Sequence, residues 1–276
     1  MKILITGSQG QVGQEVTLAC QAQGWETLAY TSKNFDITQT QELPDVDYVI
    51  NCAAYTAVDQ AEDHREQAFL VNATGTHNLA KACKEKNIPL IQLSTDYVFD
   101  GNKKTAYCEE DHANPLNVYG ASKWQGEELL RATWDRHLIL RVSWVFGRFG
   151  NNFVKTILRL AQERDELKII ADQLGGPTGA RHIAKVICTL LQHPKLHDHW
   201  GTYHYTDAPV TNWFEFAKNF ITPSICKILP LLAAEYPSKT TRPYNSALNC
   251  DKIFRTFGIT QANWQEELQG ITDGST

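Results

Sequence analysis

Short apolar runs alternate with longer amphipathic segments along the first half of the chain. The runs at residues 2–7, 47–53 and 137–142 are almost continuously apolar, which is typical of strands buried on both faces of a parallel sheet. The segments between them place apolar residues three and four positions apart, as amphipathic helices do. Strands that alternate with helices predict right-handed crossovers and a doubly wound α/β fold with a parallel sheet. We predict strands at 2–7, 25–30, 47–53, 88–99 and 137–147, and helices at 11–24, 61–87 and 114–130.

The pattern loosens after residue 147. It predicts helices at 152–164, 179–192, 212–221 and 248–258, strands at 167–172 and 202–206, and a proline-rich connection through Pro223, Pro230 and Pro237. No change of composition marks a linker. We therefore predict a sheet domain over residues 1–150, with returning segments from 168–210, and a small lobe mainly within 151–276 that is not an independent domain.

The composition indicates a globular protein with a small-molecule partner. The 276 residues are 42% hydrophobic, enough to bury one large core or a core and a small lobe. The formal net charge is −5, so the basic excess expected of a nucleic-acid-binding protein is absent. The sequence contains no apolar run of about 18 residues, and no apolar leader with a cleavage site precedes the first strand. We expect neither nucleic acid nor a membrane as a partner.

The cysteines and histidines do not suggest a metal site. Seven cysteines are scattered and never stand in CxxC spacing, which argues against a disulfide framework and against a thiolate zinc site. We expect reduced thiols in a cytoplasmic protein. His193, His197 and His199 follow a helix that Pro194 breaks, so we predict an exposed loop there and assign no metal ligands.

A glycine-rich turn follows the first predicted strand. Gly7, Gly10 and Gly13 stand in GxxGxxG spacing at the mouth of the first helix. Glycine there permits a tight turn and close approach of the backbone to a pyrophosphate, while the helix N-terminus offers free N–H donors. Because the motif opens a strand-to-helix unit, it predicts a Rossmann-type NAD(P)-binding domain over residues 1–150. The predicted cofactor contacts within the turn also include Gln9, Gln11 and Val12.

The end of the second strand bears on the choice between NAD and NADP. An acidic residue there would bond the ribose 2′-hydroxyl and repel a 2′-phosphate, but the chain carries Ser32 and Lys33. NADPH is therefore mildly favoured and NADH remains allowed, since Lys33 is equally well explained as a solvated side chain. The other predicted cofactor contacts are Asp36 and Ile37 beside the adenine, Ala53, Ala54 and Tyr55 after the third strand, and Asn72 further along.

Polar residues interrupt the fourth strand at its carboxyl end, where sheets of this kind bind ligands. Thr95 stands there, and on the next predicted helix Tyr119 and Lys123 are four residues apart and share one face. A nearby ammonium would stabilise the phenolate and lower the pKa of Tyr119 toward the working range. Each feature alone is common by chance. Their conjunction with the glycine turn makes the three residues candidates for catalysis.

This conjunction resembles the extended short-chain dehydrogenase/reductase family, whose catalytic set is a Ser or Thr, a Tyr and a Lys. The resemblance assigns these roles to Thr95, Tyr119 and Lys123. It narrows to the dTDP-4-dehydrorhamnose reductases through motifs spread over residues 1–249, among them NCAAYTAVDQAED, STDYVFDG, YGASKWQGE, LRVSWVFGRFGNNFVKTILRLAQER, DQLGGPT and RPYNSALN. Two positions depart from the family pattern: Cys52 replaces a usual alanine, and His182 stands where an acid is common.

The resemblance implies NADPH-dependent reduction of the 4-keto group of dTDP-4-dehydro-L-rhamnose, a step toward cell-surface polysaccharide. Tyr119 would protonate the developing alkoxide, Thr95 would bond that oxygen, and Lys123 would hold the nicotinamide ribose. The resemblance also associates such enzymes with Mg²⁺, but no carboxylate cluster in the sequence places a site. A homodimer is allowed, and nothing in the sequence decides the oligomeric state.

The expected substrate contacts lie in several motifs. Trp144 would stack on a pyranose face or serve as a core residue, and Arg242 would contact the diphosphate or form a surface ion pair. Backbone N–H groups at the start of the helix that follows Trp144 would meet a phosphate. The full predicted substrate set is Asp96, Tyr97, Trp144, Asn152, Phe153 and Arg242.

Two other functions share these features. An NAD-dependent nucleotide-sugar epimerase or dehydratase has the same fold and catalytic trio but regenerates its cofactor in each cycle. A non-catalytic regulatory subunit of the methionine adenosyltransferase type also resembles this family, although the intact Thr95, Tyr119 and Lys123 favour catalysis. The configuration of the product at C4, rhamnose or 6-deoxytalose, is left open.

Overall fold

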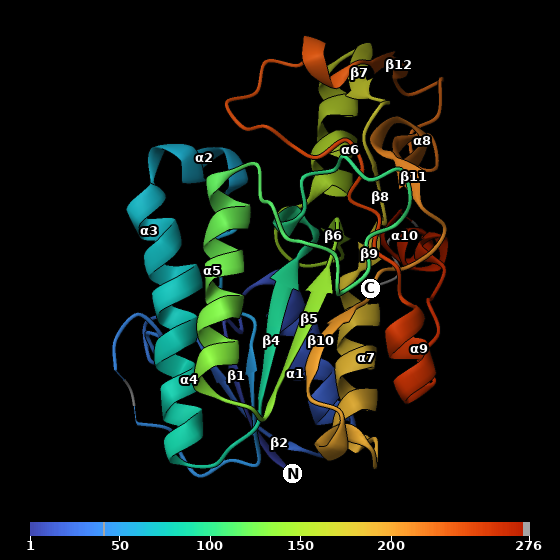
Figure 1. Ribbon diagram of the computed structural model, residues 1–276. Helices are drawn as coiled ribbons and strands as arrows, with labels where there is room; N and C mark the ends of the chain where they lie inside the picture. The colour runs from blue at the N-terminus through green and yellow to red at the C-terminus, as the bar shows by residue number, and fades with distance from the viewer. Residues whose placement is uncertain (41, 273–276) are drawn as a thin grey trace.

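The central sheet contains six parallel strands in the order β10–β5–β4–β3–β1–β2 (Figure 1). A computed structural model of the chain describes residues 1–40 and 42–272. The strands are β1 (Lys2–Thr6), β2 (Glu26–Tyr30), β3 (Tyr48–Asn51), β4 (Leu90–Thr95), β5 (His137–Val142) and β10 (Gly201–His204). The predicted doubly wound α/β fold is confirmed. The strand order reverses between β1 and β3, and sheets of this kind bind ligands at the carboxyl edge of that switch point.

Helices cover both faces of the sheet (Figure 1). Because successive strand residues point to opposite faces, Ile3 and Ile5 join the core under α1 and α7, whereas Leu4 joins the core under α4 and α5. The covering helices are α1 (Gln11–Ala22), α4 (Thr76–Glu85), α5 (Val118–Thr133) and α7 (Ala180–Gln192).

The predicted helix over residues 61–87 is broken in the structure. It consists of α2 (Val58–Asp63), α3 (Arg65–Phe69), a π-helical turn η1 (Leu70–Gly75) and α4. The first break falls at His64, whose backbone leaves the helical region with φ −117° and ψ 45°. The wider π turn presents Asn72 inward, where it is 1% exposed. A hydrophobic period alone shows neither feature, and the inward position of Asn72 accompanies its hydrogen bonds to Tyr55 and Ser122.

The second half contains several strands that were not predicted, of which β12 is the longest. β7 (Glu166–Ile170) pairs in parallel with β12 (Lys227–Leu231). The prediction of an irregular connection through Pro230 was wrong, because Pro230 lies inside β12. This sheet has two strands, β12 and β7. The backbone nitrogen of Pro230, which carries no hydrogen, points away from β7, so the strand pair loses no hydrogen bond. Two shorter pairs join β6 (Val145–Phe146) to β9 (Thr178–Gly179) and β8 (Leu174–Gly175) to β11 (Thr211–Asn212).

The remaining α-helices lie in the second half of the chain, where α9 packs on the sheet core and the others contribute to the lobe. The predicted helix at 248–258 begins only at Asp251, because Leu248 and Asn249 pair instead with Tyr107. A helix at the C-terminal end was not predicted at all. These helices are α6 (Phe153–Glu163), α8 (Trp213–Ala217), α9 (Asp251–Phe257) and α10 (Trp264–Thr272).

The lobe has a core separate from the two sheet cores. Buried apolar side chains of α6, β7, α8 and α10 form one cluster, which includes Leu167, Phe216 and Trp264 and also Phe146 from β6. The exact division of the chain into domain and lobe stays a prediction, and residues 273–276 of the predicted lobe lie outside the described part.

The structure also bears on membrane-spanning helices and on the cysteines. Within residues 1–40 and 42–272, no helix has the length and apolar character needed to cross a membrane. All seven cysteines lie in the described part of the chain, and each is a free thiol.

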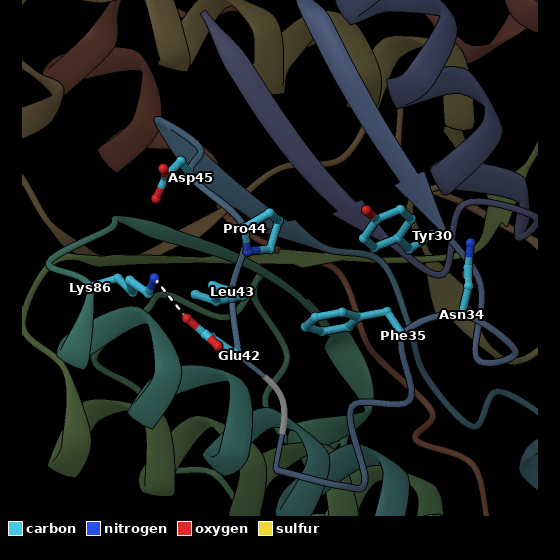
Figure 2. Close-up of a pocket in the computed structure, with 8 residues that line it drawn as sticks. All are labelled: Tyr30, Asn34, Phe35, Glu42, Leu43, Pro44, Asp45 and Lys86. Carbon is cyan, nitrogen blue, oxygen red and sulfur yellow. Dashed lines mark hydrogen bonds and ion pairs between the residues drawn. The ribbon is translucent and has the colours of Figure 1, made fainter.

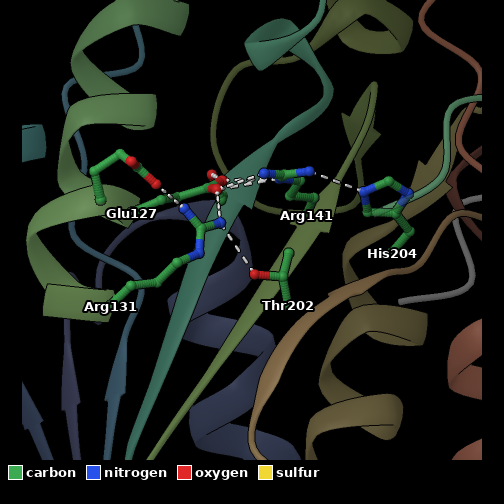
Figure 3. A network of polar contacts seen from close by, with 7 residues as sticks. Glu127, Arg131, Arg141, Thr202 and His204 are labelled. Carbon is green, nitrogen blue, oxygen red and sulfur yellow. Dashed lines mark hydrogen bonds and ion pairs between the residues drawn. The ribbon is translucent and has the colours of Figure 1, made fainter. Parts of the chain in front are cut away.

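A buried ion pair joins the sheet to α5. Arg141 on β5 is 1% exposed, and its guanidinium donates to both carboxylate oxygens of Glu127, at 3.0 Å from Nε and 2.7 Å from Nη2 (Figure 3). Glu127 also accepts from Ser94 at 2.5 Å and from Arg131 at 2.6 Å. Burial by itself would raise the pKa of Glu127, but the two arginines and Ser94 hold it below its ordinary value. These charge-assisted hydrogen bonds fix α5 against β4 and β5.

We expect Glu127→Gln to lower the free energy of unfolding by about 3–5 kcal/mol, because it leaves the Arg141 charge buried without its counterion. Urea denaturation measures the change. The matched control is Glu163→Gln, which removes the partner of Arg159 in an exposed pair and should cost less than about 1 kcal/mol. Equal losses for the two variants would contradict the assignment.

Candidate active site

The glycine turn forms a narrow cradle between β1 and α1. Gly7 has a φ of +64°, and a Cβ there would lie 2.5 Å from the backbone nitrogen of Ala53. A Cβ at Gly13 would lie 2.2 Å from the carbonyl oxygen of Gly7. Gly10 is the N-cap of α1 and offers no side-chain oxygen, which leaves the first N–H groups of the helix for an anionic ligand. The cradle therefore fits a dinucleotide pyrophosphate.

The other predicted residues of the turn differ in their surroundings. Gln9 is exposed, and Val12 packs against the sheet core. Gln11 accepts a hydrogen bond from Asn152 Nδ2 at 3.0 Å, which ties the turn to the start of α6. Gln9 and Gln11 therefore flank the open side of the cradle, whereas Val12 anchors α1.

The end of β2 lies beside the cradle, since Ser8 N donates to Tyr30 O at 3.1 Å. Ser32 and Lys33 are exposed in the loop that follows. Asp36 accepts from the backbone and the hydroxyl of Thr38, at 2.9 Å and 2.8 Å. Ile37 is buried. The structure thus brings Ser32 and Lys33 to the edge of the cofactor cradle and turns Ile37 into the core.

A hollow of about 510 Å³ lies beside β2, an edge strand of the sheet (Figure 2). Its lining combines the rings of Tyr30 and Phe35 with an ion pair between Lys86 and Glu42 at 3.3 Å. The predicted catalytic residues do not line it. Those residues lie instead at the carboxyl edge of the sheet.

Asn72 holds the loop after β3 from the inside. Its Oδ1 accepts from Tyr55 N at 2.9 Å, and its Nδ2 donates to Tyr55 O at 3.1 Å and to Ser122 Oγ at 2.9 Å. Ala53, Ala54 and Tyr55 are half-buried along the loop. The amide of Asn72 is thus engaged by the protein and links this loop to α5.

Thr95, Tyr119 and Lys123 come together at the carboxyl end of β4. Thr95 is the last residue of that strand, and its hydroxyl interacts with the phenol of Tyr119. Tyr119 and Lys123 lie in the first two turns of α5, which begins where the side chain of Asn117 accepts from Gly120 N at 2.8 Å. Lys123 is 5% exposed and donates from Nζ to Leu93 O at 2.7 Å.

The electrostatics of this trio differ from the sequence-based expectation. Burial raises the pKa of Tyr119 to about 12, although its hydrogen bond with Thr95 lowers it. Burial lowers the pKa of Lys123 to about 8, against the opposing effects of Glu127 and Cys52. The predicted lowering of the Tyr119 pKa by Lys123 was wrong for this structure, because the ammonium is directed to Leu93 O and desolvation of the phenol outweighs it.

Asp96 and Tyr97 continue from the strand end. Asp96 is 2% exposed; its Oδ1 accepts from Thr95 Oγ1 at 3.1 Å, whereas its Oδ2 lacks a well-formed hydrogen bond within the described residues. Burial raises the pKa of Asp96 to about 7, although the nearby hydroxyls of Ser246 and Thr95 lower it. The ring of Tyr97 packs edge-on against Tyr119, with centroids 6.1 Å apart. A carboxyl oxygen with spare capacity beside Tyr119 suits a polyhydroxylated ligand.

Trp144 does not offer a ring face for stacking. One face lies on Trp213, with centroids 3.5 Å apart and planes 8° from parallel. On the other face, a Cβ at Gly175 would lie 2.3 Å from Cε2 and 2.6 Å from each of Cζ2 and Nε1, which is an approach from above the ring. The prediction that this indole stacks on a pyranose was wrong, because both faces are covered.

Asn152 and Phe153 serve the start of α6. Asn152 caps the helix by accepting from Lys155 N at 3.1 Å, and its Nδ2 donates to Gly147 O at 2.8 Å. Phe153 packs on Trp213, with centroids 4.5 Å apart. Their side chains are thus committed to helix capping and lobe packing.

Arg242 forms the ion pair that was the alternative to a diphosphate contact. Its Nη2 donates to both oxygens of Asp59 on α2, at 2.8 Å and 2.9 Å, and its Nη1 donates to Ser238 at 2.6 Å. Partial burial would raise the pKa of Asp59, but Arg242 holds it below its usual range. A diphosphate would have to compete with Asp59 for this guanidinium.

The positions that depart from the family pattern have clear surroundings. His182 Nδ1 lies 2.7 Å from Asp207 Oδ2, and Cys52 lies close enough to Lys123 for the two to affect each other's pKa. Among the described residues, no group of three or more His, Cys, Asp or Glu side chains could hold a metal ion. The described residues therefore give no support for a Mg²⁺ site, and no chemical step is assigned to Mg²⁺.

Comparison with known proteins now identifies the family. The whole chain, residues 1–276, matches the family described as the RmlD substrate binding domain. The dTDP-4-dehydrorhamnose reductase of Sinorhizobium fredii is 42% identical, over 98% of this chain and 96% of that protein. The chain belongs to the dTDP-4-dehydrorhamnose reductase family. The predicted family resemblance is confirmed.

Solved structures agree with this membership. A dTDP-4-dehydrorhamnose reductase from Clostridium acetobutylicum superposes with a TM-score of 0.93 at 36% identity, covering 99% of both chains. Another, from Bacillus anthracis in complex with NADP, gives a TM-score of 0.90 at 35% identity over 99% of both chains. The bound cofactor of the second protein accords with the cradle described above.

The sequence analysis missed residues that shape the site from a distance. Gly175 and Trp213 lie against the two faces of Trp144, and Ser246 lies near Asp96. Asp59 accepts hydrogen bonds from Arg242. The glycines of DQLGGPT were the available signal for the first contact, since glycine often marks a close approach. No local pattern marks the others.

The buried lysine predicts a specific pH dependence of stability. The pKa of Lys123 falls from 10.5 to about 8 in the folded chain, so the unfolded chain binds more protons between these values. The contribution of Lys123 to stability should therefore rise with pH across this window, by about 1.4 kcal/mol for each pKa unit of the difference, whereas buried thiols such as Cys83, whose pKa burial raises from 9.0, contribute with the opposite sign in its upper part.

We expect Lys123→Met to remove this rise in urea denaturation curves recorded from pH 7 to pH 10. The control Lys84→Met changes an exposed lysine at the end of α4 and should keep the wild-type pH dependence. Identical pH profiles for wild type and Lys123→Met would show that Lys123 is not desolvated.

Proposed function

We propose that this chain reduces the 4-keto group of dTDP-4-dehydro-L-rhamnose with NADPH to give dTDP-L-rhamnose. The observation that carries the proposal is the convergence of Thr95, Tyr119 and Lys123 at the carboxyl end of β4, one strand from the loop that borders the glycine cradle. Family membership supports the substrate. The cradle supports the dinucleotide.

When bound, NADPH supplies the hydride. Tyr119 gives its proton to the oxygen that becomes the sugar hydroxyl, and its raised pKa keeps that proton in place until negative charge develops. Thr95, whose hydroxyl proton is directed to Asp96 Oδ1 in this structure, would turn that proton toward the same oxygen and donate a hydrogen bond to it. Lys123 uses one N–H for Leu93 O and retains two for the nicotinamide ribose and the phenol.

The cofactor residues proposed are those that border the cradle. Gly7, Gly10 and Gly13 admit the pyrophosphate, and Ser32 and Lys33 stand where a 2′-phosphate would lie. A lysine in place of a carboxylate supports NADPH over NADH. The remaining contacts proposed are Gln9, Gln11, Val12, Asp36, Ile37, Ala53, Ala54 and Tyr55, with Asn72 acting through the Tyr55 loop.

The substrate residues proposed surround the keto group and the diphosphate. Asp96 and Tyr97 border the catalytic phenol, and Trp144 bounds the sugar with its edge. Arg242 would leave Asp59 to bind the diphosphate, and the helix that starts at Asn152 and Phe153 would offer backbone N–H groups. The free cysteines accord with action in a reducing compartment, which for this substrate is the cytoplasm.

The direct test supplies dTDP-4-dehydro-L-rhamnose, follows the loss of NADPH absorbance and identifies the product by NMR. We expect one NADPH consumed for each dTDP-L-rhamnose formed. A 6-deoxytalose product would correct the stereochemistry, and absence of net NADPH oxidation would point to an epimerase or dehydratase.

We expect Tyr119→Phe to lower kcat by about 10²–10⁴-fold, because it removes the proton donor and keeps the ring. The Kd for NADPH, measured by fluorescence, should stay at the wild-type value. Tyr203→Phe, which removes a hydroxyl bonded to His199 O at 2.9 Å, is the control and should keep its activity. Unimpaired turnover by Tyr119→Phe would exclude this tyrosine as the donor.

A further inference from the structure

The indole of Trp144 lies between Gly175 and Trp213. We call these two residues the jaws of a clamp. Trp213 at the start of α8 lies flat against one face, with ring centroids 3.5 Å apart. Gly175 on β8 lies against the other, where an added Cβ would be 2.3 Å from Cε2. If Gly175 lay on the same face of Trp144 as Trp213, its added Cβ would contact the Trp213 ring before the Trp144 ring. The two jaws therefore lie on opposite faces of Trp144.

The spacing between the jaws is set by a strand pair. Gly175 of β8 pairs with Thr211 of β11 in antiparallel register, and Trp213 follows two residues later. Asn212 then caps α8 by accepting from Glu215 N at 2.8 Å, which fixes the direction in which Trp213 leaves the strand. The jaws thus belong to one small rigid unit with room for one aromatic ring.

The backbone of Trp144 is strained in a way that this clamp sustains. Its φ is +45°, a left-handed conformation that a bulky residue adopts only when surrounding contacts impose it. Thr178 N donates to Trp144 O at 3.2 Å. On the preceding residue, Ser143 Oγ donates to Gly176 O at 2.8 Å. The segment that supplies one jaw therefore also pins the backbone that carries the indole.

The clamp borders the catalytic groups. Thr95 pairs with Val142 in the register of β4 and β5, so Trp144 stands just beyond the same edge of the sheet. The β8 jaw is bonded to the segment that faces Asp96, because Ser246 N donates to Leu174 O at 2.8 Å. On its far side, Trp213 packs against Phe153 in the lobe core. The clamp thus connects the lobe to the sugar side of the site.

We propose that Gly175 and Trp213 are positioning residues that hold the Trp144 indole edge-on to the substrate sugar, so that this edge sets the width of the sugar site. The inference rests on the proposed function for the identity of the sugar. Its consequence is that specificity depends on residues that do not touch the substrate. Displacement of the indole should weaken sugar binding with little effect on the hydride step or on NADPH.

The first test is Gly175→Ala, whose added methyl must push the indole aside. We expect KM for dTDP-4-dehydro-L-rhamnose to rise about 10-fold or more, with kcat within about 3-fold of wild type and an unchanged Kd for NADPH. The matched control is Gly270→Ala in α10, where an added Cβ meets nothing within 4 Å. An unchanged KM would overturn the proposal. A rise in KM that is accompanied by losses of kcat and of NADPH binding would overturn it as well.

The second test adds a spectroscopic readout that does not depend on the substrate. Two indoles stacked at this distance should give an exciton couplet in the circular dichroism spectrum. We expect Trp213→Phe to abolish the couplet but to raise KM less than Trp213→Ala, because phenylalanine still covers one face. Trp200→Phe, remote from the site, should keep the couplet and the wild-type KM. A couplet that survives Trp213→Phe would exclude the clamp, whereas a wild-type chain with the couplet but no turnover would count against the proposed function alone.

Discussion

A ladder of buried side-chain hydrogen bonds crosses the sheet just below its carboxyl edge, and both halves of the active site rest on it. Thr6 Oγ1 donates to Asn51 Oδ1 at 2.6 Å, and Asn51 Nδ2 donates to Gln92 Oε1 at 2.7 Å. Gln92 Nε2 then donates to Leu93 O at 2.8 Å, the oxygen that also accepts from Lys123. Since an unpaired buried polar group is costly, a slip of one strand would orphan several groups at once. The ladder therefore fixes the glycine turn relative to Lys123.

The site above this ladder holds ionisable groups where burial opposes their charged forms. Lys123 is harder to protonate, and Asp96 and Tyr119 are harder to ionise, than they would be in water. Such groups cost stability, which the apolar layers on both faces of the sheet and the Glu127 ion pair offset. The same burial keeps the phenol of Tyr119 protonated, as the proposed role of proton donor requires.

The lobe acts on the site through packing more than through polar contacts. Trp213 and Phe153 connect its core to Trp144, and Arg242 connects it to α2 through Asp59. The residues proposed for the proton transfer lie on the sheet domain, whereas the packing around Trp144 comes from the lobe. The substrate dependence of the activity and the stability of the sheet should therefore respond to different substitutions.

The sequence by itself determined the features that arise within one or two adjacent elements. The strand-to-helix glycine turn, the polar end of β4 and the i, i+4 pair of Tyr119 and Lys123 are local patterns, and the parallel sheet aligns them at one edge. Pro230 in β12 escaped prediction because its strand pairs with β7, which is distant in the chain, and no hydrophobic pattern marks the break at His64. Only the tertiary structure decided that Lys123 is directed to Leu93 O, that Asp59 holds Arg242, and that Gly175 and Trp213 cover Trp144. Burial and contacts between distant segments set these outcomes, and neither is a property of any short stretch of sequence.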